Sequence, residues 1–115
     1  MAFSIFNSSF SIVNHRLMGD RVVHLVSAKN TRRLEGPDMI VLHYTAGTSA
    51  ESSALFLTRP DVSASAHLVI GRDGEVFQLV PFNIEAWHAG KSWYAGRGVL
   101  QNQPHALHVI FGISP

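Results

Sequence analysis

The feature that most constrains the fold is an apolar run of strand length, residues 39–44, which directly follows Pro37 and Asp38. A run with so few polar residues predicts an inner strand that is covered on both faces. Because side chains alternate along a strand, Val41, His43 and Thr45 should share one face. His43 then lies at the carboxyl end of the strand, where open α/β sheets bind their ligands. The run therefore makes His43 the first candidate for a site residue.

The segments around this run predict a second strand and a helix. Residues 21–26 are rich in valine and predict a short strand. Thr48 and Glu51 have the spacing of a capping box, so a short helix should begin there and end before Pro60. Its buried stripe should come from the apolar residues of this stretch, which are Ala50, Ala54 and Leu55 together with Phe56 or Leu57. Residues 1–20 show no strong period and are expected to form a leader or edge segment.

A hairpin and a final strand are predicted in the second half of the chain. Arg72-Asp73-Gly74 separates two apolar-rich runs, residues 67–71 and 75–80, and an Asp-Gly pair favours a type I′ turn. Residues 81–98 are polar and aromatic and predict a long loop, a kind of segment that often carries function. Residues 105–113 alternate apolar and other side chains, which predicts one more strand. His105 and His108 lie three apart there, so on a strand they face opposite sides and cannot hold one metal together.

Composition limits the chemistry. A chain of 115 residues with a net charge of +1 suits a single domain and gives no basic surface for nucleic acid, so we expect no nucleic-acid partner. With no cysteine and seven histidines, any metal must be held by imidazole and carboxylate. Residues 1–13 contain no recognisable signal peptide, and no membrane span is visible. This favours the cytoplasm and leaves a periplasmic or secreted location, and the oligomeric state, open.

Four motifs lie between residues 39 and 98, namely VLHYTA (residues 41–46), SAHLVI (65–70), GRDGEVFQLV (71–80) and AWHAG (86–90). In this order and spacing they resemble the zinc-dependent N-acetylmuramoyl-L-alanine amidases (amidase type 2), a family that includes phage amidase lysozymes and animal peptidoglycan-recognition proteins. The resemblance covers about half of the chain. It implies an α/β fold, with a mixed central β-sheet flanked by helices. Residues 21–115 would be the N-terminal part of a single amidase domain whose C-terminal part is missing.

The resemblance also implies site residues. It makes His43 the first zinc ligand, where the alternative is a histidine merely packed beside Thr45. It places His88 in the substrate groove with Trp87 as its wall, where the alternative for His88 is a loop histidine bound to backbone carbonyls. His67 would line the same substrate site, or be a buried histidine with its hydrogen bonds satisfied inside the fold.

Two departures from the family pattern concern catalysis. The other zinc ligands, a histidine and an Asp or Cys, lie in the family well downstream of AWHAG, and this chain ends before them. The general base of the family is a Glu in the strand after AWHAG, or a Tyr where this chain has Ala66, and residues 102–110 contain no carboxylate. No catalytic residue can therefore be assigned. We expect a truncated or frame-altered copy that diverges after about residue 98 and is impaired as an enzyme.

The function that the resemblance implies is hydrolysis of the amide between N-acetylmuramic acid and L-alanine, in peptidoglycan or muropeptides, by a zinc-bound water. The alternative is a peptidoglycan-binding or muropeptide-binding module without catalysis. A third hypothesis is a metal site completed by a second subunit, or by His43, His67 and His88 together. Intact wall and recycled muropeptide both remain open as substrates.

Overall fold

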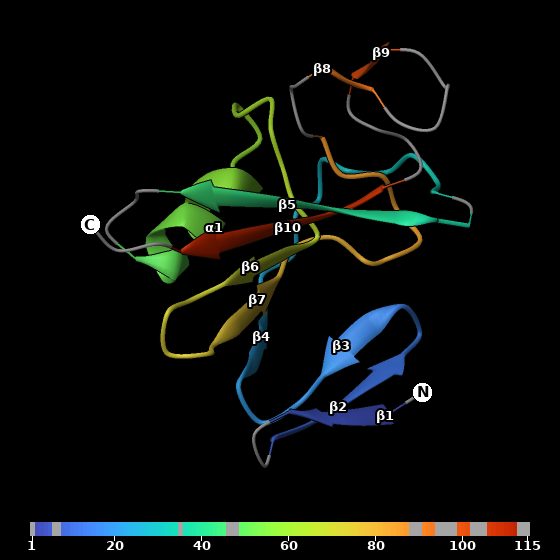
Figure 1. The fold of residues 1–115 in the computed structure, drawn as a ribbon. Coiled ribbons are helices and arrows are strands. Elements are labelled where there is room, and N and C mark those ends of the chain that lie inside the picture. The colour runs from blue at the N-terminus through green and yellow to red at the C-terminus, as the bar shows by residue number, and fades with distance from the viewer. Residues whose placement is uncertain are drawn as a thin grey trace.

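The computed structural model describes residues 2–5, 8–34, 36–45, 49–87, 91–93, 99–101 and 106–112. Its centre is a five-stranded mixed sheet in the order β4-β7-β6-β10-β5, with helix α1 on one face (Figure 1). The bounds are β4 Val22–His24, β5 Met39–Thr45, α1 Ala50–Thr58, β6 Leu68–Ile70, β7 Val76–Gln78 and β10 Ala106–Gly112. The predicted α/β class with a mixed central sheet is confirmed.

Strand β10 lies at the heart of this sheet. It runs parallel to both of its neighbours, and its Ile110 is paired with His43 of β5 on one side and with Val69 of β6 on the other. Paired residues on neighbouring strands project to the same face, so His43, Ile110 and Val69 share a face. Val69 and Ile110 belong to the buried core together with Ala50 and Ala54 of α1. The face that carries His43 is therefore the face on which the helix packs.

Strand β5 departs from the prediction of an inner strand covered on both faces. Within the described residues it pairs with β10 alone and forms the edge of the sheet. Ile40, Leu42 and Tyr44 are 62%, 62% and 76% exposed, whereas Val41 and His43 are half-buried. The predicted alternation is thus confirmed for Val41 and His43. The prediction of two covered faces is wrong for the described part of the chain, since an apolar run alone does not tell which of its faces finds a partner.

Helix α1 begins one residue later than predicted. Ser49 is its N-cap, with its side-chain oxygen accepting the backbone N–H of Ser52 at 3.0 Å. Thr48 lies outside the described residues, and Ser49 takes the N-cap role expected of it. The helix ends at Thr58, because the residue before Pro60 disfavours helical backbone. Of the predicted stripe, Ala50 and Ala54 are buried, and of the two alternatives Leu57 rather than Phe56 packs against the core. Leu55 is about half exposed, so the prediction is wrong for Leu55.

The hairpin between β6 and β7 is confirmed, but its turn differs from the predicted type I′. Beyond the strand ends at Ile70 and Val76, the Gly71 N–H donates to the Glu75 carbonyl oxygen at 2.8 Å, which leaves a three-residue loop, Arg72 to Gly74. In this loop the Gly74 N–H donates to the Gly71 carbonyl oxygen. Gly74 has φ of +87°, and Asp73 is not among the described residues with positive φ. A turn followed by one left-handed glycine is the usual three-residue hairpin, and it needs positive φ only at the glycine.

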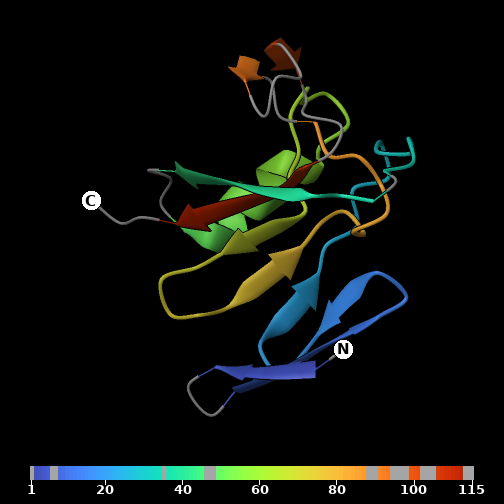
Figure 2. The same ribbon diagram turned by 45° about the vertical axis from the view of Figure 1, so that its right-hand side comes forward.

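Residues 1–20, expected to be a leader or edge segment, contain a three-stranded antiparallel sheet, β1 Ala2–Ile5, β2 Ser8–Val13 and β3 Arg16–Met18. The β2–β3 turn holds Asn14 and His15 at φ of 49° and 65°, as a two-residue type I′ turn requires. Figure 2 shows this small sheet beside β4. The Gln78 side chain joins it to the central sheet by accepting the Leu17 N–H at 2.6 Å and donating to the His15 carbonyl. The division of the chain at residue 20 stays a prediction.

The predicted loop 81–98 contains strand β8 Lys91–Trp93, which pairs with β9 Val99–Gln101. The predicted last strand is confirmed as β10. No helix in the described residues is both long and apolar enough to span a membrane.

Candidate functional site

Three histidines from neighbouring parts of the central sheet form a stack. His43 lies on β5, His108 on β10, and His67 directly precedes β6. The ring centroids of His43 and His108 are 5.4 Å apart with planes at 21°, and those of His67 and His108 are 6.3 Å apart with planes at 5°. His108 is the middle ring. Because β10 separates β5 from β6, the stack depends on all three strands being in register.

The His43 and His108 rings meet through their nitrogens. Nε2 of His43 lies 3.2 Å from Nδ1 of His108. The His108 side chain is fully buried, while His43 is half-buried. Two imidazole nitrogens at this distance share either one proton or one metal ion, because a neutral ring presents one donor and one acceptor nitrogen. The pair could therefore supply two nitrogen ligands to a metal ion at the carboxyl end of β5.

His67 is held by backbone groups at both ring nitrogens. Its Nδ1 accepts the backbone N–H of His108 at 3.0 Å, and its Nε2 donates to the carbonyl oxygen of Ile84 at 2.7 Å. Burial lowers the pKa of His67 to about 4, although the hydrogen bond to Ile84 acts in the opposite direction. His67 is thus neutral near pH 7, with its proton on Nε2.

Trp87 is fixed through Ser65 and lies near Lys29. The backbone N–H of Ser65 donates to the Trp87 carbonyl, and the Trp87 N–H donates to Ser65 Oγ at 2.7 Å. The Lys29 ammonium lies 5.8 Å from the centroid of the Trp87 ring, within reach of a cation–π attraction. Ser65 belongs to the SAHLVI motif and Trp87 to AWHAG, so these contacts join two of the four motifs.

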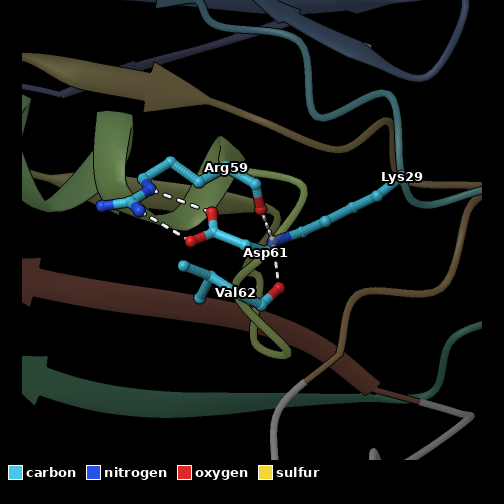
Figure 3. A network of polar contacts seen from close by, with 4 residues as sticks. All are labelled: Lys29, Arg59, Asp61 and Val62. Carbon is cyan, nitrogen blue, oxygen red and sulfur yellow. Dashed lines mark hydrogen bonds and ion pairs between the residues drawn. The ribbon is translucent and has the colours of Figure 1, made fainter.

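Lys29 also organises the segment that follows helix α1. Its ammonium donates to the carbonyl oxygens of Arg59 at 2.8 Å, Val62 at 2.6 Å and Ala64 at 3.0 Å, and Figure 3 shows its side chain reaching the first two. Arg59 and Asp61 form a bidentate ion pair in the same turn. Desolvation lowers the pKa of Lys29, and the Asp61 carboxylate opposes this. These contacts hold in place the segment between the end of α1 and Ser65, which leads on to His67.

The profile of one protein family, described as N-acetylmuramoyl-L-alanine amidase, matches residues 31–102, which is more than half of the chain. The chain belongs to this amidase family. The matched segment contains two of the three stacked histidines, His43 and His67. It also contains Ser65 and Trp87, which are hydrogen-bonded to each other.

Individual relatives of the chain agree with the family assignment. The chain is 43% identical over 54 residues to the 1,6-anhydro-N-acetylmuramyl-L-alanine amidase AmpD of Escherichia coli, which covers 47% of this chain and 30% of that protein. It is 38% identical over 58 residues to the N-acetylmuramoyl-L-alanine amidase XlyA of Bacillus subtilis, covering 47% of this chain and 19% of that protein. These matches therefore span less than a third of the relatives' length.

Solved structures of AmpD agree with the fold of the chain. A crystal structure of a Se-Met AmpD derivative superposes with a TM-score of 0.70 at 25% identity, covering 90% of this chain and 66% of the other. The solution structure of Citrobacter freundii AmpD gives 0.54 at 27% identity, covering 82% and 59%. The similarity in fold thus extends well beyond the segment aligned in sequence.

The structure brings some of the predicted site residues together. His43 and His67 both stack with His108, while Trp87 lies beside Lys29 and Ser65. His88 lies outside the described residues, as does His105. The described residues contain no group of three or more His, Cys, Asp or Glu side chains arranged to hold a metal ion. The roles assigned to His43, His67, Trp87 and His88 remain predictions.

Sequence reasoning missed three residues of this site. Local spacing relates His108 only to His105, since nothing local shows that β10 lies beside β5. Ser65 was included in a motif without a role of its own. Nothing in the local sequence indicates a structural role for Lys29, because the three carbonyls that it binds are 30 to 35 positions away in the chain.

Proposed function

We propose that the protein hydrolyses the amide bond between N-acetylmuramic acid and L-alanine in peptidoglycan or in muropeptides. Its membership of the amidase family supports this, as do relatives that are themselves named muramoyl-alanine amidases. The observation that carries the proposal is the position of His43. Its half-buried ring lies at the carboxyl end of β5 and presents a nitrogen toward a second imidazole.

The family implies a zinc ion, and the chemistry of the donor set fits one. Neutral imidazole nitrogen is a preferred zinc ligand, and His43 is partly exposed at the end of its strand. His43 would therefore hold the ion. When bound, zinc lowers the pKa of its water to about 7 and polarises the amide carbonyl. A hydrolytic zinc takes three protein ligands, so His43 requires others, and the expected impairment of this chain stays a prediction.

On the substrate side, Trp87 would form the wall of the groove. Its backbone is fixed by two hydrogen bonds to Ser65, so the indole is presented from a rigid base. A flat apolar ring suits a sugar ring or the methyl group of an alanine. His88 follows directly and is proposed to contact the same ligand. For His67 we favour the structural role, because both of its ring nitrogens are already occupied by backbone groups.

The test is release of stem peptide from a defined muropeptide by the purified chain with zinc present, followed by mass spectrometry. We expect His43→Ala to abolish release. His15→Asn is the matched control, because His15 is exposed in the β2–β3 turn, where asparagine is well tolerated. Equal release by wild type and His43→Ala would contradict the proposal. Muropeptide binding without release, unchanged by a chelator and by His43→Ala, would favour the non-catalytic binding module instead.

A further inference from the structure

We propose that His108 of β10 is a metal ligand beside His43, so that the two imidazoles hold one transition-metal ion between adjacent parallel strands. The inference deepens the proposed function and rests on it for the presence of a metal at His43. It adds a ligand that the family motifs do not supply, on a strand that lies after the last of those motifs.

The distance between the two nitrogens carries the argument. Zinc binds histidine nitrogen at 2.0–2.1 Å in a tetrahedral arrangement, which places two ligand nitrogens about 3.3 Å apart. Nε2 of His43 and Nδ1 of His108 are 3.2 Å apart. An ion bound at this distance from both nitrogens would lie beside the line that joins them, so both rings would turn toward it. His43 is half-buried, so it is partly accessible to solvent and to an ion, whereas His108 is fully buried.

The fold holds His108 in place for this role. Its backbone N–H donates to Nδ1 of His67, and its carbonyl oxygen accepts the backbone N–H of His67 at 3.0 Å. His67 is in turn anchored to the carbonyl of Ile84. His108 is stacked between the other two rings and is fully buried. These hydrogen bonds fix the backbone of His108 and burial restricts its ring, so His108 would lose little conformational freedom on binding a metal.

The donor set also defines the class of ion. Two imidazoles suit Zn²⁺, Co²⁺, Ni²⁺ and Cu²⁺, whereas Mg²⁺ and Ca²⁺ prefer oxygen ligands. His67 could bind the same ion only by giving up the backbone hydrogen bond at the ring nitrogen that met the metal. The ion would complete its coordination with water or with groups outside the described residues. The backbone hydrogen bonds of His67 argue against the set of His43, His67 and His88, which the sequence leaves open as a metal site.

The experiment is a Co²⁺ titration of the whole chain after treatment with a chelator, followed by visible absorption and then by displacement with Zn²⁺. We expect binding of one Co²⁺ by the wild type, with affinity lowered about 10-fold to 100-fold or more in His43→Ala and equally in His108→Gln. His15→Asn should bind as the wild type does. Circular dichroism establishes which variants are folded. X-ray absorption of the wild-type zinc complex needs no variant, and it should show scattering from two imidazoles.

A spectrum with one imidazole, or unchanged Co²⁺ affinity in a folded His108→Gln, would overturn the inference and leave the proposed function standing on His43. Absence of Co²⁺ and Zn²⁺ binding by the wild type would also overturn it. Two-imidazole binding without release of stem peptide would support the inference while the proposed function fails. The metal readout and the peptide-release readout are therefore independent.

Discussion

His67 illustrates how burial and backbone hydrogen bonds select one form of a titratable side chain. A protonated ring could not accept the His108 N–H at Nδ1, so protonation would break that hydrogen bond as well as place a charge inside the fold. The pKa of His67 is accordingly about 4, below the ordinary value for histidine. The neutral ring of His67 is therefore held in one position beside β10 by its two hydrogen bonds.

This gives a prediction for stability against pH in the presence of a chelator. Above about pH 6.5 His67 is neutral in both states and adds no pH dependence. As the pH falls from 6.5 toward 4, the unfolded chain binds a proton that the folded chain does not, so stability falls, and below 4 the loss is complete. Between pH 7 and 4.5 the free energy of unfolding should fall by about 2.5 kcal/mol more in the wild type than in His67→Gln. Urea unfolding across this range is the measurement, and parallel curves for the two proteins would contradict it.

Lys29 provides a second prediction for a single residue. Lys29→Met keeps most of the aliphatic stem but removes three hydrogen bonds to the carbonyls of residues 59, 62 and 64. We expect the free energy of unfolding to fall by about 1–3 kcal/mol, and the tryptophan fluorescence to change because the ammonium near Trp87 is lost. Arg72→Met, which removes an exposed cation in the hairpin loop, is the control and should change neither. Unaltered stability in Lys29→Met would show that these hydrogen bonds exchange with water at no net cost.

The secondary-structure elements show which patterns can be read locally. Strands β4, β5, β6, β7 and β10 were all predicted, because apolar runs and alternation depend only on neighbouring residues. The N-cap was misplaced by one residue because Thr48 and Ser49 are both good caps and the local sequence does not decide between them. The β2–β3 turn was missed because Asn14-His15 lacks the glycine that usually marks a type I′ turn.

The hairpin loop offers a prediction for one of these elements. Gly74 has φ of +87°, and a Cβ there would lie 3.2 Å from Nη1 of Arg21, the end of a flexible side chain that can move away. Backbone strain therefore dominates, and Gly74→Ala should lower the free energy of unfolding by about 1–2 kcal/mol. Gly74→Asn should cost less, because asparagine tolerates the left-handed region. Thermal unfolding of both variants tests this, and equal melting temperatures for Ala and Asn would contradict the conformational explanation.

For the whole molecule, the arrangement of the site depends on sequence-distant strand pairing. His43 could be proposed as a site residue from its place at the end of an apolar run, since that position is visible in the sequence. Its partner could not, because His108 is 65 positions away and reaches His43 only when β10 inserts between β5 and β6. The choice of strand order is decided by packing of the complete sheet, which local periodicity does not encode.

The same long-range arrangement predicts that metal binding stabilises the fold. Because the two proposed ligands come together only in the folded chain, an ion that binds them favours the folded state. Zn²⁺ at about 100 times its dissociation constant should raise the free energy of unfolding by about 2.7 kcal/mol, and a chelator should reverse this.

Urea unfolding with Zn²⁺, with Mg²⁺ and with chelator is the measurement. Mg²⁺ should have no effect, and His43→Ala and folded His108→Gln should lose most of the response that His15→Asn retains. An equal response to Zn²⁺ in all of these variants would mean that the ion binds other histidines, and the two-strand site would then be excluded.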